Sequence, residues 1–389
     1  MIMSPKIRMI ILFLIAFVAS WLIYRPILDI AKTKNMTDNP DARKLQDSPV
    51  PVLGGIAVFF GVVVGLCYFK TMLNYVSLFP LLGAMVIMLY VGTIDDIADL
   101  KPVTRLVVEV GVALLLIYGN RMTAIDFDGL WGIGRIPIAA AIPLTVVMCV
   151  GVVNAVNMID GIDGLVASMS VFAVTCFGLI FFLSHDYSFA ALSAVTVGAL
   201  LPFVFHNVFG RESKMFMGDG GTMMVGIMLS SMVIETLGGK LHLRIYQPWM
   251  DFNLVSFSLA VMAMPVFDTL RVMTVRMLEG RSPFRADNTH FHHYLVRAGF
   301  SHIATVFVMV CLNAAVVAVL ILAWASGASA GMQLLAVIAA ASAADFGISA
   351  YLSHCLENGI PEGLRSAAER SHFERRGFWA RITDFVDRF

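Results

Sequence analysis

The chain has 389 residues, of which 59% are hydrophobic and only 14% are charged, and its formal net charge is zero. A soluble domain carries about 25% charged residues, so this composition excludes an ordinary water-soluble protein. The balanced charge leaves no basic footprint for nucleic acid. Five scattered cysteines without a CxxC pair favour neither a disulfide framework nor a thiolate metal site.

Eleven apolar stretches follow one another along the chain, each near the roughly 20 residues that cross a bilayer as a helix. They predict an all-α polytopic membrane protein with about 11 transmembrane helices. The expected spans are 8–24, 50–69, 77–94, 103–119, 138–156, 165–184, 188–205, 220–238, 253–275, 303–325 and 332–354.

The distribution of lysine and arginine predicts the orientation of these spans. If the 25–49 loop is cytoplasmic, 20 of the 27 basic residues lie on the cytoplasmic side. Because basic residues are in excess in cytoplasmic loops, the N-terminus is expected outside and the C-terminus in the cytoplasm. Lys6 and Arg8 favour the reverse locally, but five basic residues just after the first span outnumber them.

Two regions are expected. Residues 1–355 would form one integral membrane domain, and residues 356–389 a cytoplasmic basic amphipathic tail. Six arginines and several aromatic residues alternate in this tail. Such a composition is typical of a helix that lies on the inner leaflet, although a solvated tail would have it too.

Four polar segments interrupt the apolar sequence. Two expected spans separate each segment from the next, so all four emerge on the same side of the bilayer, predicted to be the cytoplasmic one. Charged groups near hydrocarbon are costly, which makes one shared polar site the economical explanation. The segments are 92–99, 154–164, 216–221 and 290–293.

The first segment carries Asp95, Asp96 and Asp99 where the third span ends. If the helix continues, Asp95 and Asp99 share one face at i, i+4 spacing, with Asp96 a short rotation away. Like charges at that spacing repel each other unless a cation neutralises them. The cluster therefore indicates a functional site, with a solvated helix end as the alternative.

The second segment combines Asn154, Asn157, Asp160 and Asp163 with two glycines. The glycines allow a turn whose backbone can approach a ligand closely, and hard oxygen ligands suit Mg²⁺. A polar turn without a ligand is the alternative, because turn residues also cluster for backbone reasons alone.

The third segment opens the eighth span with Phe216 and with three glycines around Asp219. Glycine amides at a helix start form an anion cradle, and a carboxylate there would repel phosphate unless a divalent metal bridges the two. This is not a P-loop, because no Gly-Lys-Ser/Thr follows the glycines.

The fourth segment contains His290, His292 and His293, in a loop that begins near Arg276 and carries further arginines. Three histidines within four residues could ligate zinc, yet neither Cys nor Glu completes a recognised zinc pattern. Guanidinium forks match phosphate oxygens, so diphosphate binding is favoured. Zinc binding and a solvated loop are the alternatives.

Taken in order, these motifs resemble the polyprenyl-phosphate N-acetylhexosamine-1-phosphate transferases, of the glycosyltransferase 4 type, and within them the WecA and TagO branch. The resemblance covers most of the chain. At positions 45–48, Leu-Gln-Asp-Ser departs from the more basic stretch of that branch. The motifs are Asp41-Ala-Arg43-Lys44, Pro51-Val-Leu-Gly54-Gly55, Asp95-Asp96-Ile-Ala-Asp99, Asn157 to Asp163, Phe216 to Asp219, Ser282-Pro283-Phe284 and His290-Phe-His292-His293.

The resemblance implies roles for individual residues. Asn157 and Asp219 are expected to ligate Mg²⁺, with Mn²⁺ as an alternative metal. Asp163 is expected to face a uracil ring on which Phe216 stacks, and Asn207 to contact the nucleotide. The phosphates or the sugar would be bound by Lys44 and Arg276, and the residues expected to act in catalysis are Asp95, Asp96, Asp99, Asp160, His290, His292 and His293.

The implied reaction transfers N-acetylhexosamine-1-phosphate, with N-acetylglucosamine favoured as the sugar, from a UDP-sugar to undecaprenyl phosphate and releases UMP. It would occur at the cytoplasmic face of a bacterial inner membrane, as the first membrane step of cell-envelope polysaccharide synthesis. Expected partners are these two substrates and membrane lipids, with a homodimer left open. The alternatives are another UDP-amino-sugar, as in the related phospho-MurNAc-pentapeptide translocase, and an ion-coupled transporter, because intramembrane carboxylates also mark ion pathways.

The chemistry of the acceptor bears on the mechanism. A phosphate monoester has a second pKa of about 6, so it is mostly a dianion at pH 7 and hardly requires a general base. We therefore expect direct displacement at the β-phosphorus rather than a covalent aspartyl-phosphate intermediate. Asp95 and Asp96 would mainly organise charge and position the acceptor.

Overall fold

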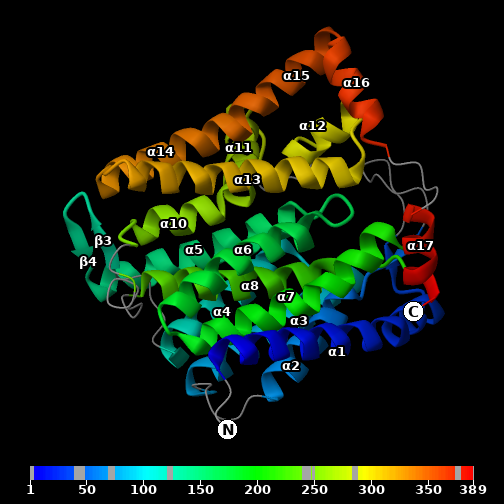
Figure 1. The fold of residues 1–389 in the computed structure, drawn as a ribbon, viewed down its shortest axis with the longest axis horizontal. Helices are drawn as coiled ribbons and strands as arrows, with labels where there is room; N and C mark the ends of the chain where they lie inside the picture. The colour runs from blue at the N-terminus through cyan, green and yellow to red at the C-terminus, as the bar shows by residue number, and fades with distance from the viewer. Residues whose placement is uncertain are drawn as a thin grey trace.

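The computed structural model describes residues 4–38, 49–68, 75–120, 126–238, 247, 250–282, 288–372 and 378–388. Within these residues the chain is helical apart from two short antiparallel strand pairs. Figure 1 shows α8 in the middle of a stack of helices, with α13 and α14 on one side of it and α1 and α2 on the other. The all-α membrane architecture expected from the apolar pattern is confirmed.

The elements fall into three groups. The long helices are α1 (Pro5–Thr33), α3 (Tyr75–Ala98), α4 (Pro102–Asn120), α5 (Ile138–Met158), α6 (Leu165–Leu183), α7 (Tyr187–Phe209), α8 (Gly218–Leu237) and α13 (His302–Ala325). The shorter ones are α2 (Gly54–Cys67), α10 (Leu254–Val261), α11 (Ala263–Leu278), α12 (Phe291–Arg297), α14 (Ala330–Ser342), the π-helix η1 (Ala343–Gly347), α15 (Ile348–Asn358), α16 (Glu362–Arg370) and α17 (Phe378–Arg388). The strands are β1 (Thr37–Asp38) with β2 (Val50–Pro51), and β3 (Asp126–Leu130) with β4 (Ile133–Arg135).

Each of the eleven expected spans contains a helix, but not all of them are long and straight. In the described residues nine helices, with α14 to α15 taken as one, are long and apolar enough to cross a membrane. The expected span 50–69 is represented by α2, which has 14 residues. The expected span 253–275 consists of α10 and α11, which together are long and apolar enough to cross but are bent by 74° where they meet.

The bend between α10 and α11 is stabilised by one side chain of α13. Asn313 donates its amide to the carbonyls of Ala260 and Val261 at 3.3 and 2.9 Å and accepts the N–H of Met264 at 2.8 Å. Broken helices at membrane depth persist where protein groups satisfy the freed backbone. Pro265, which has no N–H to donate, is the third residue of α11 after the break. The local apolar pattern does not predict this break, because the asparagine that satisfies its backbone groups is far away in the sequence.

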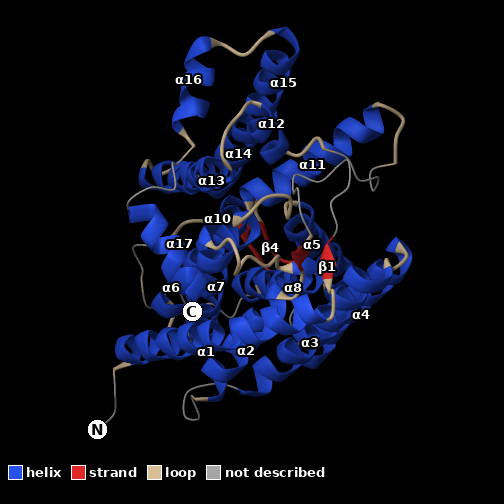
Figure 2. Cartoon of the chain, turned by 90° about the vertical axis from the view of Figure 1, so that its right-hand side faces the viewer, coloured by secondary structure: helices blue, strands red, loops and turns tan. Residues whose placement is uncertain are grey.

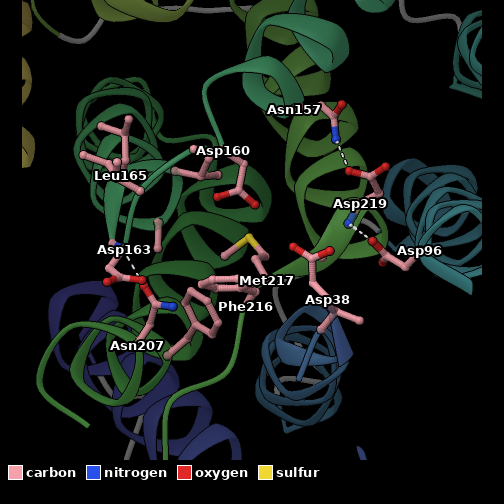
Figure 3. Close-up of a pocket in the computed structure, with 18 of the residues that line it drawn as sticks. Asp38, Asp96, Asn157, Asp160, Asp163, Leu165, Asn207, Phe216, Met217 and Asp219 are labelled. Carbon is pink, nitrogen blue, oxygen red and sulfur yellow. Dashed lines mark hydrogen bonds between the residues drawn. The ribbon is translucent and has the colours of Figure 1, made fainter. Parts of the chain in front are cut away.

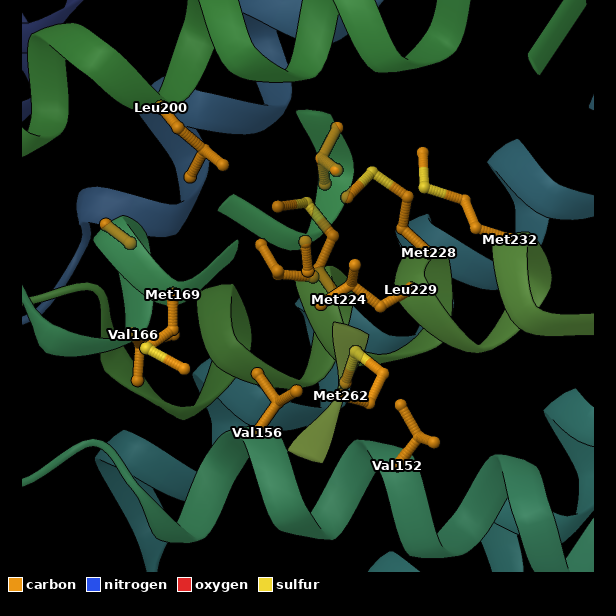
Figure 4. Close-up of a cluster of buried hydrophobic side chains, with 14 of the residues drawn as sticks. Val152, Val156, Val166, Met169, Leu200, Met224, Met228, Leu229, Met232 and Met262 are labelled. Atoms are coloured by element: carbon orange, nitrogen blue, oxygen red, sulfur yellow. The ribbon is translucent and has the colours of Figure 1, made fainter. Parts of the chain in front are cut away.

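The central helix α8 is apolar on nearly all sides and almost wholly buried, as expected for a helix enclosed by others. Figure 4 shows methionines of α8, including Met224, Met228 and Met232, packed among side chains of α5 and α6. At its start, α8 crosses α3 at a glycine. A Cβ at Gly92 of α3 would lie only 2.5 Å from the backbone of Asp219. Glycine at such crossings lets helix backbones approach closely. This contact brings the ends of α3 and α8 together.

The short strand pair β1 and β2 completes the same end of the molecule. The N–H of Phe216 donates to the carbonyl of Pro51 at 2.7 Å, and the N–H of Gly54 donates to the carbonyl of Phe216 at 2.9 Å. Figure 2 shows β1 near the ends of α5 and α8. The loop before α8 is thereby fixed to the entry of α2.

Candidate active site

A cavity of about 610 Å³ lies where the ends of α3, α5, α7 and α8 meet. Its volume is within the range of small-molecule sites. Residues of all four polar segments line it, so the prediction that they share one site is confirmed. The sequence-predicted residues that line it are Asp95, Asp96, Asp99, Asn157, Asp160, Asp163, Asn207, Phe216, Asp219 and His293.

One end of the cavity is organised around Arg105 of α4. Its Nη1 lies 2.7 Å from Oδ2 of Asp95 and 3.2 Å from Oδ2 of Asp219, and its Nη2 donates to Oδ1 of Asn157 at 2.8 Å. Asn157 in turn donates to Oδ1 of Asp219 at 2.8 Å. Three oxygens from three helices thus converge on one cationic group.

Asp96 caps α8 from the neighbouring helix α3. Its carboxylate accepts the N–H of Asp219 at 2.9 Å and that of Gly220 at 3.4 Å (Figure 3). The residue before α8, Met217, supplies no side-chain cap of its own. A carboxylate at a helix N-terminus satisfies free amides and interacts favourably with the helix dipole. Asp96 therefore orients the backbone that carries Asp219.

Asp99 is not on a helix face shared with Asp95, which corrects the expected i, i+4 arrangement. Helix α3 ends at Ala98, and Asp99 adopts a left-handed φ of 47° with its N–H bonded to the carbonyl of Asp95. A proline begins α4 at position 102 and prevents the helix from running on. The exposed side chain of Asp99 still lines the cavity.

Asp160 lies between the two ends of the cavity, in the loop from α5 to α6 (Figure 3). Enclosure by the cavity walls, together with repulsion from Asp219, Asp96 and Asp163, raises the pKa of Asp160 to about 7. The side chain itself stays open to solvent in the cavity. Near neutral pH this carboxyl is thus close to its midpoint of ionisation.

The other end of the cavity is built around Asp163. Its Oδ2 lies 2.8 Å from Nζ of Lys214 and 2.9 Å from Nδ1 of His302. Although burial acts to raise it, the hydrogen bond from His302 and the charge of Lys214 hold the pKa of Asp163 below its usual value. Lys214 also lies 5.5 Å from the centre of the Phe216 ring. An ionised carboxylate and an aromatic ring therefore face this end together.

Asn207 of α7 connects the loop between α5 and α6 to the loop between α7 and α8. Its Oδ1 accepts the N–H of Gly164 at 2.5 Å, and its Nδ2 donates to the carbonyl of Met215 at 2.9 Å. The side chain is only 4% exposed. Asn207 thus borders the cavity while its amide is occupied by backbone groups.

The structure places the three histidines of this segment differently, one at the cavity wall and two in the interior. His293 lines the cavity, whereas His290 and His292 are buried behind it. Nδ1 of His290 lies 2.8 Å from Oδ2 of Asp268. Burial, with the neighbouring His293, lowers the pKa of His292 well below its usual value, so this ring is neutral. A Cβ at Gly161 would lie 2.1 Å from Nε2 of His292, so the ring packs directly on the 159–164 loop.

Neither basic residue expected to bind phosphates or the sugar is among the described residues that line this cavity. Arg276 is buried in α11, 1% exposed, and is not among the described lining residues. Lys44 lies outside the described residues, as does the preceding motif from Asp41.

The donor set at the Arg105 end fits a hard divalent cation. Within the described residues no three His, Cys, Asp or Glu side chains gather as a metal cage. Mg²⁺ is nevertheless commonly bound by one or two carboxylates together with waters and substrate phosphates. Asp219, the amide oxygen of Asn157 and Asp95 already converge on a cation there, so they suit such an open site.

Comparison with known proteins relates this arrangement to a family. Residues 78–237, which run from within α3 to the end of α8, match the family model described as glycosyl transferase family 4. The chain is similar to this family over that part of its length. Its relatives include the undecaprenyl-phosphate alpha-N-acetylglucosaminyl 1-phosphate transferase of Escherichia coli O157:H7, 29% identical over 294 residues, 74% of this chain and 76% of that one. The probable undecaprenyl-phosphate N-acetylglucosaminyl 1-phosphate transferase of Bacillus subtilis (strain 168) is 28% identical over 315 residues, 79% and 83% of the two chains.

No motif in the sequence marks three of the basic or histidine side chains at this site, which are Arg105, Lys214 and His302. Arg105 and Lys214 counted only toward membrane orientation, and His302 opens an apolar span. The signal for Arg105 was available, because a basic residue on the first turns of a span seldom faces lipid. Lys214 and His302 depend on how distant segments meet, so the sequence offered no comparable signal.

Proposed function

We propose that the protein transfers N-acetylglucosamine-1-phosphate from UDP-N-acetylglucosamine to undecaprenyl phosphate and releases UMP. Relatives that bear the name of this activity align over about three quarters of the chain. The observation that carries the proposal is the two-ended cavity, with a cation-binding oxygen cluster at one end and the Asp163 and Phe216 pair at the other. We propose a bacterial inner membrane location with the cavity facing the cytoplasm.

The uridine is proposed to bind at the Asp163 end. Phe216 offers a ring for stacking, and the ionised Asp163 is an acceptor for an N–H of the base. Asn207, buried between the two loops, would support this end rather than contact the nucleotide through its amide. Lys214 contacts both Asp163 and the Phe216 ring, so its ammonium can also interact with the phosphate nearest the uridine.

The diphosphate is proposed to extend toward Asn157 and Asp219. Seven carboxylates and two permanent cations are found among the described cavity residues, so anionic substrates would be repelled without further positive charge. Mg²⁺, held by Asp219 and Asn157, would supply charge neutralisation at the phosphates. Arg105 provides permanent positive charge at the same position.

Direct displacement at the β-phosphorus remains the mechanism that we propose. The acceptor phosphate is already a dianion at pH 7, so no strong base is needed. Asp95 accepts the N–H of Leu100 at 2.6 Å and pairs with Arg105, and Asp96 caps α8, so both carboxylates are engaged in holding the site. Trapping of a phosphorylated aspartate from UDP-sugar without acceptor would contradict direct displacement.

The experiment that tests the function is Mg²⁺-dependent release of UMP from UDP-N-acetylglucosamine by the purified protein with undecaprenyl phosphate. Release that requires both lipid and metal is the expected result. A parallel panel of UDP-N-acetylgalactosamine and UDP-MurNAc-pentapeptide tests the sugar. Absence of release with every donor would overturn the proposal, and release with another donor alone would change the assigned sugar.

A further inference from the structure

The two side chains that contact the Asp163 carboxylate come from distant parts of the chain. Lys214 lies in the loop between α7 and α8, and His302 is the first residue of α13. Both contact the same carboxylate oxygen, at 2.8 and 2.9 Å. The direction in which Asp163 faces the cavity therefore depends on where these two segments are held.

The first of these segments is fixed by the C-terminal helix α17. Oδ1 of Asp387 accepts the N–H of Ser213 at 3.0 Å, its Oγ–H at 2.8 Å and the N–H of Arg211 at 3.1 Å. Burial opposes ionisation, but these hydrogen bonds lower the pKa of Asp387 below its usual value. Ser213 is fully buried and directly precedes Lys214.

Aromatic contacts hold α17 against the bundle. Phe385 packs on Trp21 of α1 with ring centres 5.9 Å apart, and Trp379 stacks on Phe209 of α7 at 5.6 Å. Figure 1 shows α17 at the ends of α1 and α7. Phe385 is also 54% exposed, so the helix can touch lipid at the same time. Contact with lipid alone, however, does not explain the hydrogen bonds of Asp387.

The second segment is fixed by the end of α16. Ser371 accepts the N–H of Ser301 at 2.9 Å, and the hydroxyl of Ser301 donates to the carbonyl of Ser371 at 2.7 Å. Nε2 of His372 lies 2.9 Å from the carbonyl oxygen of Gly299. Ser301 is the N-cap of α13 and directly precedes His302. Ser213 and Ser301, to which the two C-terminal helices bind, thus each directly precede a residue that contacts Asp163.

We propose that α16 and α17 form a strap that positions His302 and Lys214 against Asp163 and thereby sets the affinity for the uridine nucleotide. Asp387 and Ser371 are its positioning residues. The inference rests on the proposed function only in naming the uridine nucleotide as the ligand of the Asp163 end. It assigns the C-terminal tail a role at the cavity in addition to any contact with the membrane surface.

The test uses the full-length protein in detergent and compares Asp387→Ala, which removes the acceptor oxygens, with Asp384→Ala. The control makes the same charge change on an exposed side chain of the same helix. UMP affinity by calorimetry is the readout that needs no turnover, and hydrogen exchange of residues 211–217 reports on the anchored loop. For Asp387→Ala we expect UMP to bind about fivefold to tenfold more weakly and the loop to exchange faster, with both properties unchanged in the control.

Steady-state kinetics separate a positioning role from general damage. The KM for UDP-N-acetylglucosamine should rise about as much as the UMP affinity falls, while kcat and the KM for undecaprenyl phosphate stay near wild type. Ser371→Ala should show the same pattern through the other anchor. Unchanged UMP affinity in Asp387→Ala, or a parallel loss of kcat and of affinity for both substrates, would overturn the strap. A wild-type protein that binds UMP but never releases it from a UDP-sugar would instead overturn the proposed function.

Discussion

The carboxylate of Asp96 accepts the backbone N–H of Asp219 at 2.9 Å. This bond connects the end of α3 to the start of α8 and fixes the backbone on which the proposed metal ligand is carried. The two helices can come this close because Gly92 has no side chain to keep the backbone of Asp219 away. Asp96 therefore contributes to the site through the fold as well as through its charge.

Substitution of Asp96 separates these two contributions. Asp96→Ala removes the cap and should lower the stability of the protein by about 1 kcal/mol, the usual effect of losing an N-cap acceptor. Asp96→Asn keeps an acceptor oxygen, so its stability should stay near wild type while transfer falls by roughly 100-fold or more from the lost charge. Thermal unfolding in detergent and the UMP-release assay measure the two effects. Equal destabilisation by both variants would contradict the capping role.

Arg105→Ala should strengthen the binding of Mg²⁺ in the absence of substrates. The guanidinium contacts Asp95, Asp219 and Asn157, the same oxygens that a metal would use, so cation and arginine compete. An increase in apparent affinity of at least about fivefold is expected for such a coupling. The measurement is the Mg²⁺ concentration that half-saturates the shift in melting temperature, with the exposed Lys101→Ala as control. Weaker or unchanged binding would show that the guanidinium does not occupy the cation position.

Asp219→Asn should abolish transfer. The amide keeps the size of the side chain and can still bond to Asn157, but the metal loses its anionic ligand. We expect no measurable release of UMP even at high Mg²⁺, in a protein that still elutes as a single species on size exclusion. Near-normal turnover would reject Asp219 as the metal ligand.

Gly161→Ala tests the contact between the 159–164 loop and the buried histidines. The new Cβ would lie 2.1 Å from Nε2 of His292, so either the ring or the loop must move, and Asp160 and Asp163 move with the loop. Transfer should fall by at least about tenfold, as expected for a displacement near 1 Å at a site. Gly151→Ala on α5, where a Cβ meets nothing within 4 Å, should leave transfer unchanged. Similar activity of the two variants would argue against this contact.

Asp160→Asn should alter how stability depends on pH. The pKa of this carboxyl is about 7 in the folded protein and 3.8 ordinarily, so the folded state holds a proton that the unfolded chain loses between about pH 4 and pH 7. The free energy of unfolding therefore falls as pH rises through this window. The variant lacks this loss and should gain about 1 kcal/mol over wild type at pH 8, a figure kept small because solvent in the cavity screens the charge. Melting temperatures at pH 5 and pH 8 give the difference, and an equal gain at both would contradict the assignment.

Local pattern was sufficient for much of this protein. Apolar length predicts its helices, and parity along the chain predicts that four polar segments meet at one site, because both depend only on the cost of exposing polar groups to lipid. Motif order predicts the family. Local pattern did not predict the bend at Met262, because the backbone there is satisfied by Asn313 of the distant helix α13. Nor did it predict that α3 ends before Asp99, where the backbone turns into a left-handed conformation.

The sequence by itself thus determined that the four polar segments meet, and it named most of the carboxylates that line their cavity. Only the tertiary structure decided their partners. Arg105 meets Asp219 across α4 and α8, and Lys214 and His302 meet at Asp163 beneath the C-terminal helices. These contacts arise from close helix crossings at glycines and from anchors far away in the chain, and no local periodicity records the geometry of such long-range packing.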